Sequence, residues 1–260
     1  MMAIIDGSGE WSNDTYRTSF THSFCRQTAD ALGSARHPYF YNRGPSSAGL
    51  ETGPYARRAI NWLKQNHAER PREPVYLMGF SRGAAACVTV ASFLRSEAPK
   101  LRITAMFLFD AVDRSIFTDA ETVPGNVDVC HHIVRDYSWN TWWEGKHRHN
   151  RWYFNSDALE GERGVEMDIG GPVLGSHGAI GGTPWPDNAR DPQAVITVAN
   201  WMNSRLSRHR LPRALNAAHC YPEGSPMDRR VEGLLQPRPR PPSGLRPSAS
   251  SGIQHRGAGR

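Results

Sequence analysis

The sequence predicts an α/β fold in which helices cover both faces of a mostly parallel sheet. Apolar runs typical of strands alternate along the chain with segments of helical spacing. The strand candidates are apolar throughout, as strands buried on both faces are, and do not alternate between apolar and polar residues. Such sheets carry their chemistry in loops beyond the carboxyl ends of the strands, so reactive side chains are expected directly after strands.

The N-terminal half alternates as this fold requires. In chain order, the predicted elements are a strand over 2–5, a helix over 20–32 closed by Gly33, a loop over 34–53, a helix over about 55–67, a strand over 75–78 and a small, apolar, buried helix over 84–94. The loop prediction rests on the glycines and the proline between residues 44 and 53, which break regular structure.

The C-terminal half continues the alternation. Strands are predicted over 103–109, 127–134 and 166–174, the last interrupted by glycines. The final element is an amphipathic helix, which Asp191 is predicted to cap, with Pro192 in its first turn. Its apolar face is formed by Val195, Val198, Ala199, Met202 and Leu206.

The length and composition of the chain fit one globular domain. It has 260 residues, of which 38% are hydrophobic, too many for a disordered protein. No apolar run reaches the roughly 18 residues that a membrane helix needs, and the N-terminus has no basic lead before a long apolar stretch. We expect cytoplasmic synthesis without a signal peptide, so that any export uses a non-classical secretion system. The four scattered cysteines form no CxxC pair and are expected to be reduced and buried.

The C-terminal end differs in composition from the rest. Residues 208–260 carry ten arginines and three acids, a balance of +7, so the net charge of +6 leaves −1 for residues 1–207. The high pI is therefore no argument for nucleic-acid binding. We expect the α/β domain to cover 1–210 and a Pro/Arg/Ser-rich tail to cover 211–260, disordered from about residue 221 because it lacks core residues.

The segment Gly79-Phe80-Ser81-Arg82-Gly83 fits the pattern G-x-S-x-G and joins a predicted strand to a predicted helix. A tight turn at such a junction projects the serine hydroxyl from the sheet, and flanking glycines let the backbone pass without a clash. The bare pattern occurs by chance in roughly one chain in ten. Its position between a predicted strand and a predicted helix excludes most of these chance matches. We predict that Ser81 is a nucleophile.

Two further positions complete a Ser-Asp-His arrangement. Asp110 ends a predicted strand, where a carboxylate can orient an imidazole, and Asp113 and Asp136 are alternatives that position alone leaves open. His177 lies in the Gly-rich loop 175–182, between the last strand and the last helix, and is the predicted general base. The chain order of serine, acid and histidine is that of the α/β-hydrolases.

Backbone N–H groups from two places are predicted to form an oxyanion hole. The amide of Arg82 opens the helix after the nucleophile, and the amides of Gly7 and Ser8 follow the first strand. The Arg82 side chain has two open roles, which are binding a substrate carboxylate or phosphate and pairing with an acid of the protein. Ester hydrolysis by such a site requires no cofactor and no metal.

Four segments together resemble the bacterial and fungal GFSRGA-type lipases, a group that includes the phospholipase effectors of type VI secretion. The segments are Asp6-Gly7-Ser8, Gly79 to Ala84, Phe109 to Val112 and His177 to Gly182. The family patterns at these places are Asp-Gly-Thr, Gly-Phe-Ser-Arg-Gly-Ala, Trp-Asp-Thr-Val and His-Ser-Asp-Val-Gly-Gly. The resemblance implies a lipase or phospholipase-type ester hydrolase that contacts membrane surfaces transiently, and it favours Asp110 as the triad acid.

The chain departs from this family in two ways. Its histidine loop lacks the Ser-Asp that follows the histidine, and its length is too short for the large membrane-docking regions of many effectors. The alternatives are a soluble short-acyl esterase or thioesterase and a catalytically inactive scaffold that acts as a binding module. No pattern in the sequence predicts an oligomeric state.

Residues 138–154 form an aromatic cluster with interleaved basic residues. This segment is predicted either to line an acyl pocket as a lid or, more plainly, to pack on the core as a covering loop. Nucleic-acid binding is not expected. His131, His132, His147 and His149 are not expected to bind zinc, because no carboxylate or cysteine completes a ligand spacing.

Overall fold

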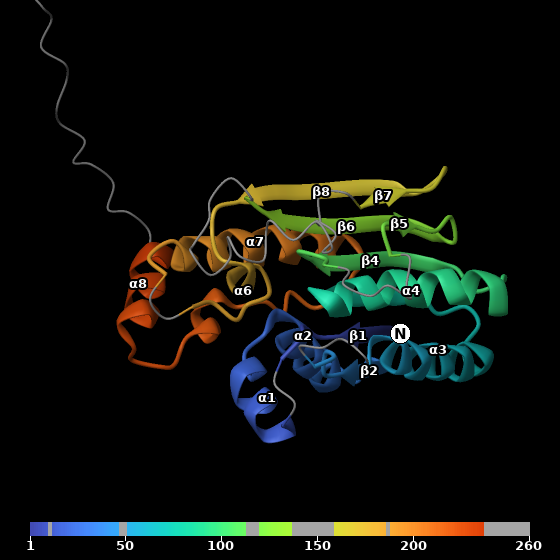
Figure 1. The fold of residues 1–260 in the computed structure, drawn as a ribbon, viewed down its shortest axis with the longest axis horizontal. Coiled ribbons are helices and arrows are strands. Elements are labelled where there is room, and N and C mark those ends of the chain that lie inside the picture. The colour runs from blue at the N-terminus through green and yellow to red at the C-terminus, as the bar shows by residue number, and fades with distance from the viewer. Residues whose placement is uncertain (10–11, 47–50, 113–119, 137–158, 186–187, 237–260) are drawn as a thin grey trace, which may run out of the picture.

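The computed structural model describes residues 1–9, 12–46, 51–112, 120–136, 159–185 and 188–236. Six strands form one parallel sheet in the order β2-β1-β3-β4-β6-β8, which Figure 1 shows from the blue β1 to the yellow β8. These strands are β1 (Met2–Ile5), β2 (Tyr39–Asn42), β3 (Tyr76–Phe80), β4 (Ile103–Phe109), β6 (Val127–Arg135) and β8 (Glu166–Val173). The two-residue strands β5 (Thr122–Val123) and β7 (Glu160–Gly161) pair separately.

Helices bury both faces of the sheet. On one face, α3 (Thr52–Glu69) and α4 (Arg82–Glu97) enclose one apolar core with residues of β1, β3 and β4. On the other face, a second apolar core is enclosed by α2 (Phe24–Ser34), α6 (His177–Ile180), α7 (Asp191–Arg208) and α8 (Pro226–Leu235). The predicted α/β class, with a mostly parallel sheet covered by helices on both faces, is confirmed.

The strand order reverses direction at β1. From β1 the chain runs outward to the edge strand β2, returns to β3 on the other side, and then adds β4, β6 and β8 in sequence. The carboxyl ends of β1 and β3 are therefore neighbours, with Ile5 in register with Gly79. A crevice beyond such a reversal is where open α/β sheets bind ligands.

Two N-terminal elements differ from the sequence prediction. The expected loop 34–53 contains strand β2, whose aromatic residues Tyr39–Tyr41 are partly exposed because β2 pairs on one side only. The expected helix 20–32 corresponds to α2, which begins at Phe24, and it is preceded by a helix that the sequence did not predict, α1 (Asn13–Phe20). Ser23 sets the start of α2, because its Oγ accepts a hydrogen bond from the Arg26 amide, 3.0 Å away, and caps the helix.

The folded unit extends beyond residue 210, where the sequence prediction ends it. The 3₁₀ turn Ala217–Cys220 and helix α8 pack on the second core. Leu215, Cys220 and Val231 are buried there, so this segment does have core residues, spaced too far apart to be recognised in a Pro- and Arg-rich sequence. Residues 237–260 of the predicted tail lie outside the described residues.

Among the described residues, no helix is long and apolar enough to cross a membrane. The four cysteines are all buried and free, as expected.

Candidate active site

Ser81 occupies a sharp turn between β3 and α4. Its backbone has φ 55° and ψ −124°, a left-handed conformation that costs a non-glycine residue about 1–3 kcal/mol. The flanking glycines are required by space. A Cβ on Gly79 would lie 2.6 Å from the Ala84 nitrogen, and a Cβ on Gly83 would lie 2.1 Å from the Ile5 oxygen. The sequence therefore holds the serine in a strained turn packed directly against the end of β1.

The structure brings Ser81, His177 and Asp110 into one hydrogen-bonded line. His177 Nε2 lies 2.8 Å from Ser81 Oγ, and His177 Nδ1 lies 2.6 Å from Asp110 Oδ2. Asp110 is fully buried, Ser81 is 8% exposed and the His177 side chain is 26% exposed. A carboxylate acceptor at Nδ1 favours the tautomer with the proton on Nδ1, which leaves Nε2 to accept the serine proton.

Asp110 is held at the end of β4 by its neighbours. Its backbone has φ 39°, its Oδ1 accepts a hydrogen bond from the Arg135 amide at 3.3 Å, and Arg135 Nε lies 3.3 Å from Oδ2. Among the three acids that the sequence left open, Asp110 is the one bonded to His177 Nδ1. The Asp136 amide binds the Val173 carbonyl at the end of β8, and Asp113 lies outside the described residues.

His132 supports the same turn from inside the sheet. Its Nε2 accepts a hydrogen bond from the Ala111 amide at 3.1 Å. The ring is fully buried, and this desolvation lowers the pKa of His132 to about 4, although the nearby Asp110 charge acts in the opposite direction. Its neighbour His131 points to the other face of the sheet, where its Nδ1 lies 2.8 Å from Asp168 Oδ2.

The His177 loop is fixed by Asp191, the residue that the sequence analysis expected to cap the last helix. Asp191 begins α7, whose N-cap is Arg190, and its carboxylate turns back to the histidine loop instead. Oδ1 accepts from the Ser176 amide at 2.8 Å, while Oδ2 accepts from Ser176 Oγ at 2.5 Å and from the Trp185 amide at 2.9 Å. Asp191 is fully buried, so these bonds define where the loop lies.

Two more contacts place the His177 ring. Ser176 caps α6, because its Oγ accepts from the Ala179 amide at 3.1 Å, and His177 is the first residue of that helix. The Phe80 ring lies against the imidazole, with 4.9 Å between ring centroids. Phe80 is the residue before the nucleophile, so the turn that exposes Ser81 also positions its base.

Asp6 organises the loop that follows β1. It is fully buried, and its carboxylate accepts hydrogen bonds from the Gly7 amide (2.8 Å), Ser23 Oγ (2.5 Å) and Tyr41 Oη (2.9 Å). Desolvation raises the pKa of Asp6 to about 6 despite these donors, which act to lower it. Sequence reasoning recognised the Asp-Gly-Ser segment but missed this network, whose members come from three separate elements.

The two predicted donors of this loop differ in their surroundings. The Gly7 amide donates a hydrogen bond to the carboxylate of its own neighbour, Asp6 Oδ1, at 2.8 Å. The Ser8 hydroxyl is buried and has no hydrogen-bond partner among the described residues. The loop borders the serine turn, because Gly83 at the start of α4 packs on the Ile5 and Asp6 carbonyls.

The Arg82 side chain is buried and forms a hydrogen bond with the protein backbone. It is 6% exposed, and its Nη1 donates to the Ser46 carbonyl at 2.8 Å, which ties α4 to the segment after β2. Within the described part of the chain, no cluster of three or more histidine, cysteine or acidic side chains could hold a metal ion. His147, His149 and the aromatic segment 138–154 lie outside the described residues.

No family model matches the chain. No curated protein matches its sequence. Solved structures with some likeness include a cutinase-like protein from Cryptococcus sp. (TM-score 0.28, 15% identity, 51% of this chain and 52% of that one). A second is a protein described as a hydrolase of the alpha/beta superfamily from Xanthomonas campestris pv. campestris (TM-score 0.36, 16% identity, 78% of this chain and 98% of that one). A third is a protein described as a YdeN-like hydrolase from Pectobacterium atrosepticum (TM-score 0.39, 15% identity, 82% of this chain and 94% of that one). The chain thus spans about half of the first of these, and likeness at this level places no constraint on activity.

Proposed function

We propose that this protein is a serine hydrolase that cleaves carboxylic esters, with Ser81 as nucleophile, His177 as general base and Asp110 as the acid that orients the imidazole. The observation that carries the proposal is the continuous line Ser81 Oγ–His177 Nε2 (2.8 Å) and His177 Nδ1–Asp110 Oδ2 (2.6 Å). A strained, glycine-flanked turn at the reversal point of the sheet supports the same assignment.

In the first half of the reaction, His177 Nε2 takes the Ser81 proton while Ser81 Oγ attacks the ester carbonyl carbon. Asp110 stabilises the resulting imidazolium. When the tetrahedral intermediate collapses, His177 gives this proton to the departing alkoxide, and the acyl group stays on Ser81. In the second half, water attacks the acyl-enzyme with His177 as base, and the carboxylic acid leaves with Ser81 restored.

The negative oxygen of the intermediate needs two donors. One is the backbone amide of Arg82, which opens α4 and benefits from the positive end of the helix dipole. For the second, we assign Ser8 in preference to Gly7, because the Gly7 amide binds Asp6 while the Ser8 hydroxyl is buried without a partner among the described residues. The buried position of the Ser8 hydroxyl supports this side chain as a donor, whereas the sequence analysis named only the backbone amide of Ser8.

We propose lipid esters as the substrate class, so that the enzyme is of lipase or phospholipase type. The four motif segments that resemble the GFSRGA-type lipases support this, with transient contact to a lipid surface following from it. No contact among the described residues specifically supports the alternative, a soluble short-acyl esterase or thioesterase.

Ester hydrolysis by the purified protein tests the proposal. We expect release of p-nitrophenol from p-nitrophenyl butyrate and of fatty acid from phosphatidylcholine liposomes, both abolished in Ser81→Ala. The control is Ser96→Ala, which removes an exposed hydroxyl that donates to the Phe93 carbonyl and should keep full activity. Activity on the soluble ester alone would contradict the lipid assignment, and activity on neither would favour an inactive scaffold.

A further inference from the structure

A pocket of about 690 Å³ lies at the end of the sheet opposite to Ser81. Met2 and Tyr76 line it, and they begin β1 and β3, whereas Ser81 follows the other end of β3. The five residues of β3 separate the two places by about 16 Å. The volume is typical of pockets that bind small molecules. A ligand bound here lies apart from the ester that the proposed hydrolysis would cleave.

The inner surface of this pocket is apolar. Met2, Leu32 and Tyr76 are buried members of the second core, and Leu211 packs against them. The one hydroxyl in this group is already used, because Tyr76 Oη donates to the His209 carbonyl at 3.3 Å. Such a surface binds the apolar body of a ligand and offers it no hydrogen bond.

Two arginines with an unusual backbone conformation line the same pocket. Arg36 has φ 56° and Arg210 has φ 58°, in the left-handed region that favours glycine. Each follows a helix, α2 or α7, and its amide binds a carbonyl of the last turn at 3.0 Å. Among the described residues, the other non-glycine residues with positive φ are Ser81 and Asp110. A helix end alone is satisfied better by glycine, and strained backbone is typical of functional sites.

No acid of the described chain neutralises these two arginines. Both side chains are exposed, and neither Arg36 nor Arg210 forms an ion pair or a side-chain hydrogen bond in the part of the chain that the structure describes. Glu73 is the one acid among the lining residues. Its carboxylate lies 3.9 Å from the Met1 amine and 3.9 Å from Arg70 Nε, so it is engaged with other cations.

Two other basic residues of the lining have partners outside it. Arg208 Nη1 lies 3.8 Å from Asp168 Oδ2. His209 Nε2 lies 3.0 Å from His131 Nε2, and desolvation lowers the pKa of His209, which favours the neutral ring. The ends of α2 and α7 each contribute about half a negative charge, against the full positive charge of the arginine that follows. An excess of about one positive charge therefore remains at these two positions.

We propose that this pocket binds an amphipathic carboxylate, namely a fatty-acid anion of medium chain length. Guanidinium groups pair with carboxylates in planar, bidentate geometry, and Arg36 and Arg210 supply this contact at the rim. The alkyl chain lies on the apolar surface that Met2, Leu32 and Tyr76 form. A head with a single charge and one apolar body matches a lining with about one excess positive charge and an apolar interior. The proposal does not rest on the ester hydrolysis.

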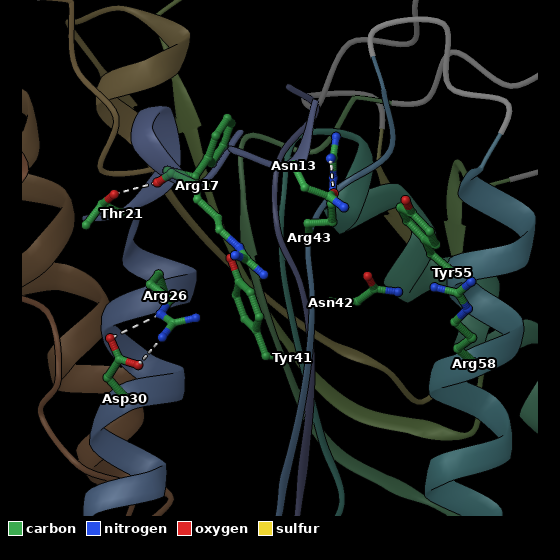
Figure 2. A pocket seen from close by; sticks show the side chains of 11 residues that line it. Asn13, Arg17, Thr21, Arg26, Asp30, Tyr41, Asn42, Arg43, Tyr55 and Arg58 are labelled. Carbon is green, nitrogen blue, oxygen red and sulfur yellow. Dashed lines mark hydrogen bonds and ion pairs between the residues drawn. The ribbon is translucent and has the colours of Figure 1, made fainter. Parts of the chain in front are cut away.

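A different pocket, of about 900 Å³ beside β2, provides a contrast. Figure 2 shows Arg17 on one side of it and Tyr55 and Arg58 on the other, in a lining that is mostly polar. Arg26 and Asp30 of this lining pair with each other, with 3.1 Å between Nη2 and Oδ1. This pocket has charged groups but little apolar surface for an alkyl chain, so its arginines serve as a control for the effect of charge alone.

Calorimetric titration of the full-length protein with octanoate tests the site without requiring any catalytic activity. We expect saturable binding that weakens at least about tenfold in Arg36→Gln, Arg210→Gln, because each lost charge-assisted hydrogen bond is worth about that factor or more. The matched control Arg17→Gln, Arg58→Gln removes the same charge from the pocket beside β2 and should bind octanoate as the wild type does.

Two further probes separate the head from the chain. Acetate has the carboxylate without the alkyl chain, and 1-octanol has the chain without the charge. Because the proposed site uses both parts, each probe should bind at least about tenfold more weakly than octanoate.

A second variant separates binding from folding. Arg36→Gly, Arg210→Gly removes both charges but gives the two helix ends the residue that their backbone conformation favours. We expect this variant to lose octanoate binding while its thermal unfolding temperature stays close to or above that of the wild type. Octanoate should raise the unfolding temperature of the wild type and leave that of the variant unchanged.

The proposal is overturned if the wild type does not bind octanoate, if acetate or 1-octanol binds equally well, or if the control variant loses as much affinity as the Arg36, Arg210 variants. Ser81→Ala leaves the pocket intact and should bind octanoate unchanged. Loss of binding in Ser81→Ala would place the octanoate at the active site and also overturn the proposal. Failure of ester hydrolysis would leave these binding results unchanged.

Discussion

The role proposed for Ser8 depends on contacts that the sequence describes only in part. Its position in an Asp-Gly-Ser segment after the first strand indicated an oxyanion donor, but the choice between Gly7 and Ser8 depends on where Asp6 turns. Asp6 accepts from Ser23 and Tyr41, which are 17 and 35 residues away in the chain. No local pattern predicts contacts at that separation, so this part of the site required the structure.

Replacing Ser8 with alanine should lower kcat for ester hydrolysis about 100-fold with little change in KM, because the lost donor acts on the developing oxyanion and not on the bound ester. Steady-state kinetics on p-nitrophenyl butyrate measure this. Ser12→Ala is the control, since Ser12 is exposed and makes no capping bond at the start of α1. Wild-type kcat in Ser8→Ala would remove Ser8 from the oxyanion hole.

His132 makes the stability of the protein depend on pH. Burial holds its pKa at about 4, below the usual value of 6.5, so the folded state favours the neutral ring. The stabilisation is therefore complete above about pH 6.5 and is lost as the pH falls toward 4, by up to about 3 kcal/mol. Denaturant unfolding of the wild type and of His132→Gln should show a stability difference that shrinks over this range. A difference that stays constant with pH would contradict the assignment.

At the scale of elements, the sequence predicted well those segments that are buried on both sides. Strand β4 matches its expected bounds and β6 differs from them by one residue. The half-exposed β2 was missed because it has only four residues and lies in a segment whose glycines and proline predict a loop. The start of α2 was expected at residue 20, because a capping serine such as Ser23 and a helix-interior serine look alike in one sequence.

For Asp191 the sequence predicted the position at the start of a helix correctly, but the role of the side chain wrongly. Its position before Pro192 is typical of a helix cap, yet its carboxylate holds the His177 loop through Ser176 and Trp185. The sequence does not distinguish an aspartate that caps its own helix from one that anchors a loop, because the hydrogen-bond partners of Asp191 lie on the preceding loop. The sequence nevertheless identified His177 as the candidate base, because this histidine lies in a Gly-rich loop between the last predicted strand and the last predicted helix.

Asp191→Ala should lower kcat more than tenfold and reduce the free energy of unfolding by about 3 kcal/mol, because several buried donors lose their charged acceptor. Asp191→Asn, which keeps one acceptor oxygen, should recover part of both. Kinetics and thermal unfolding, measured on the same samples, separate an effect on the position of His177 from an effect on the stability of the fold. The control Asp128→Ala breaks only a surface ion pair with Arg102. An unchanged kcat in a destabilised Asp191→Ala would make the residue structural only.

At the scale of the whole molecule, the folded unit reaches residue 236, and α7 and α8 together close the second core. The expected boundary at 210 followed from composition, since Pro, Arg and Ser dominate this end. Composition averages over a window, however, and a few buried side chains suffice to hold a short helix against an existing core. The reversal of strand order at β1 also belongs to this scale, because only the assembled sheet places the loops after β1 and β3 together.

Val231→Ala on α8 tests whether this segment contributes to the stability of the whole. Val231 is fully buried, so its truncation should reduce the free energy of unfolding by about 1–3 kcal/mol. Leu234→Ala on the same helix, at a side chain 46% exposed, should change it by less than about 0.5 kcal/mol. Equal effects in urea unfolding would mean that α8 is not part of the cooperative unit.

The proposed hydrolysis depends most directly on an activated serine at position 81. Labelling the purified, folded protein with a fluorophosphonate probe, followed by peptide mass spectrometry, measures this without any choice of substrate. We predict one adduct per chain on Ser81, absent in Ser81→Ala and strongly slowed in His177→Gln. A folded wild-type protein that stays unlabelled, or that is labelled equally well after Ser81→Ala, would contradict the central claim.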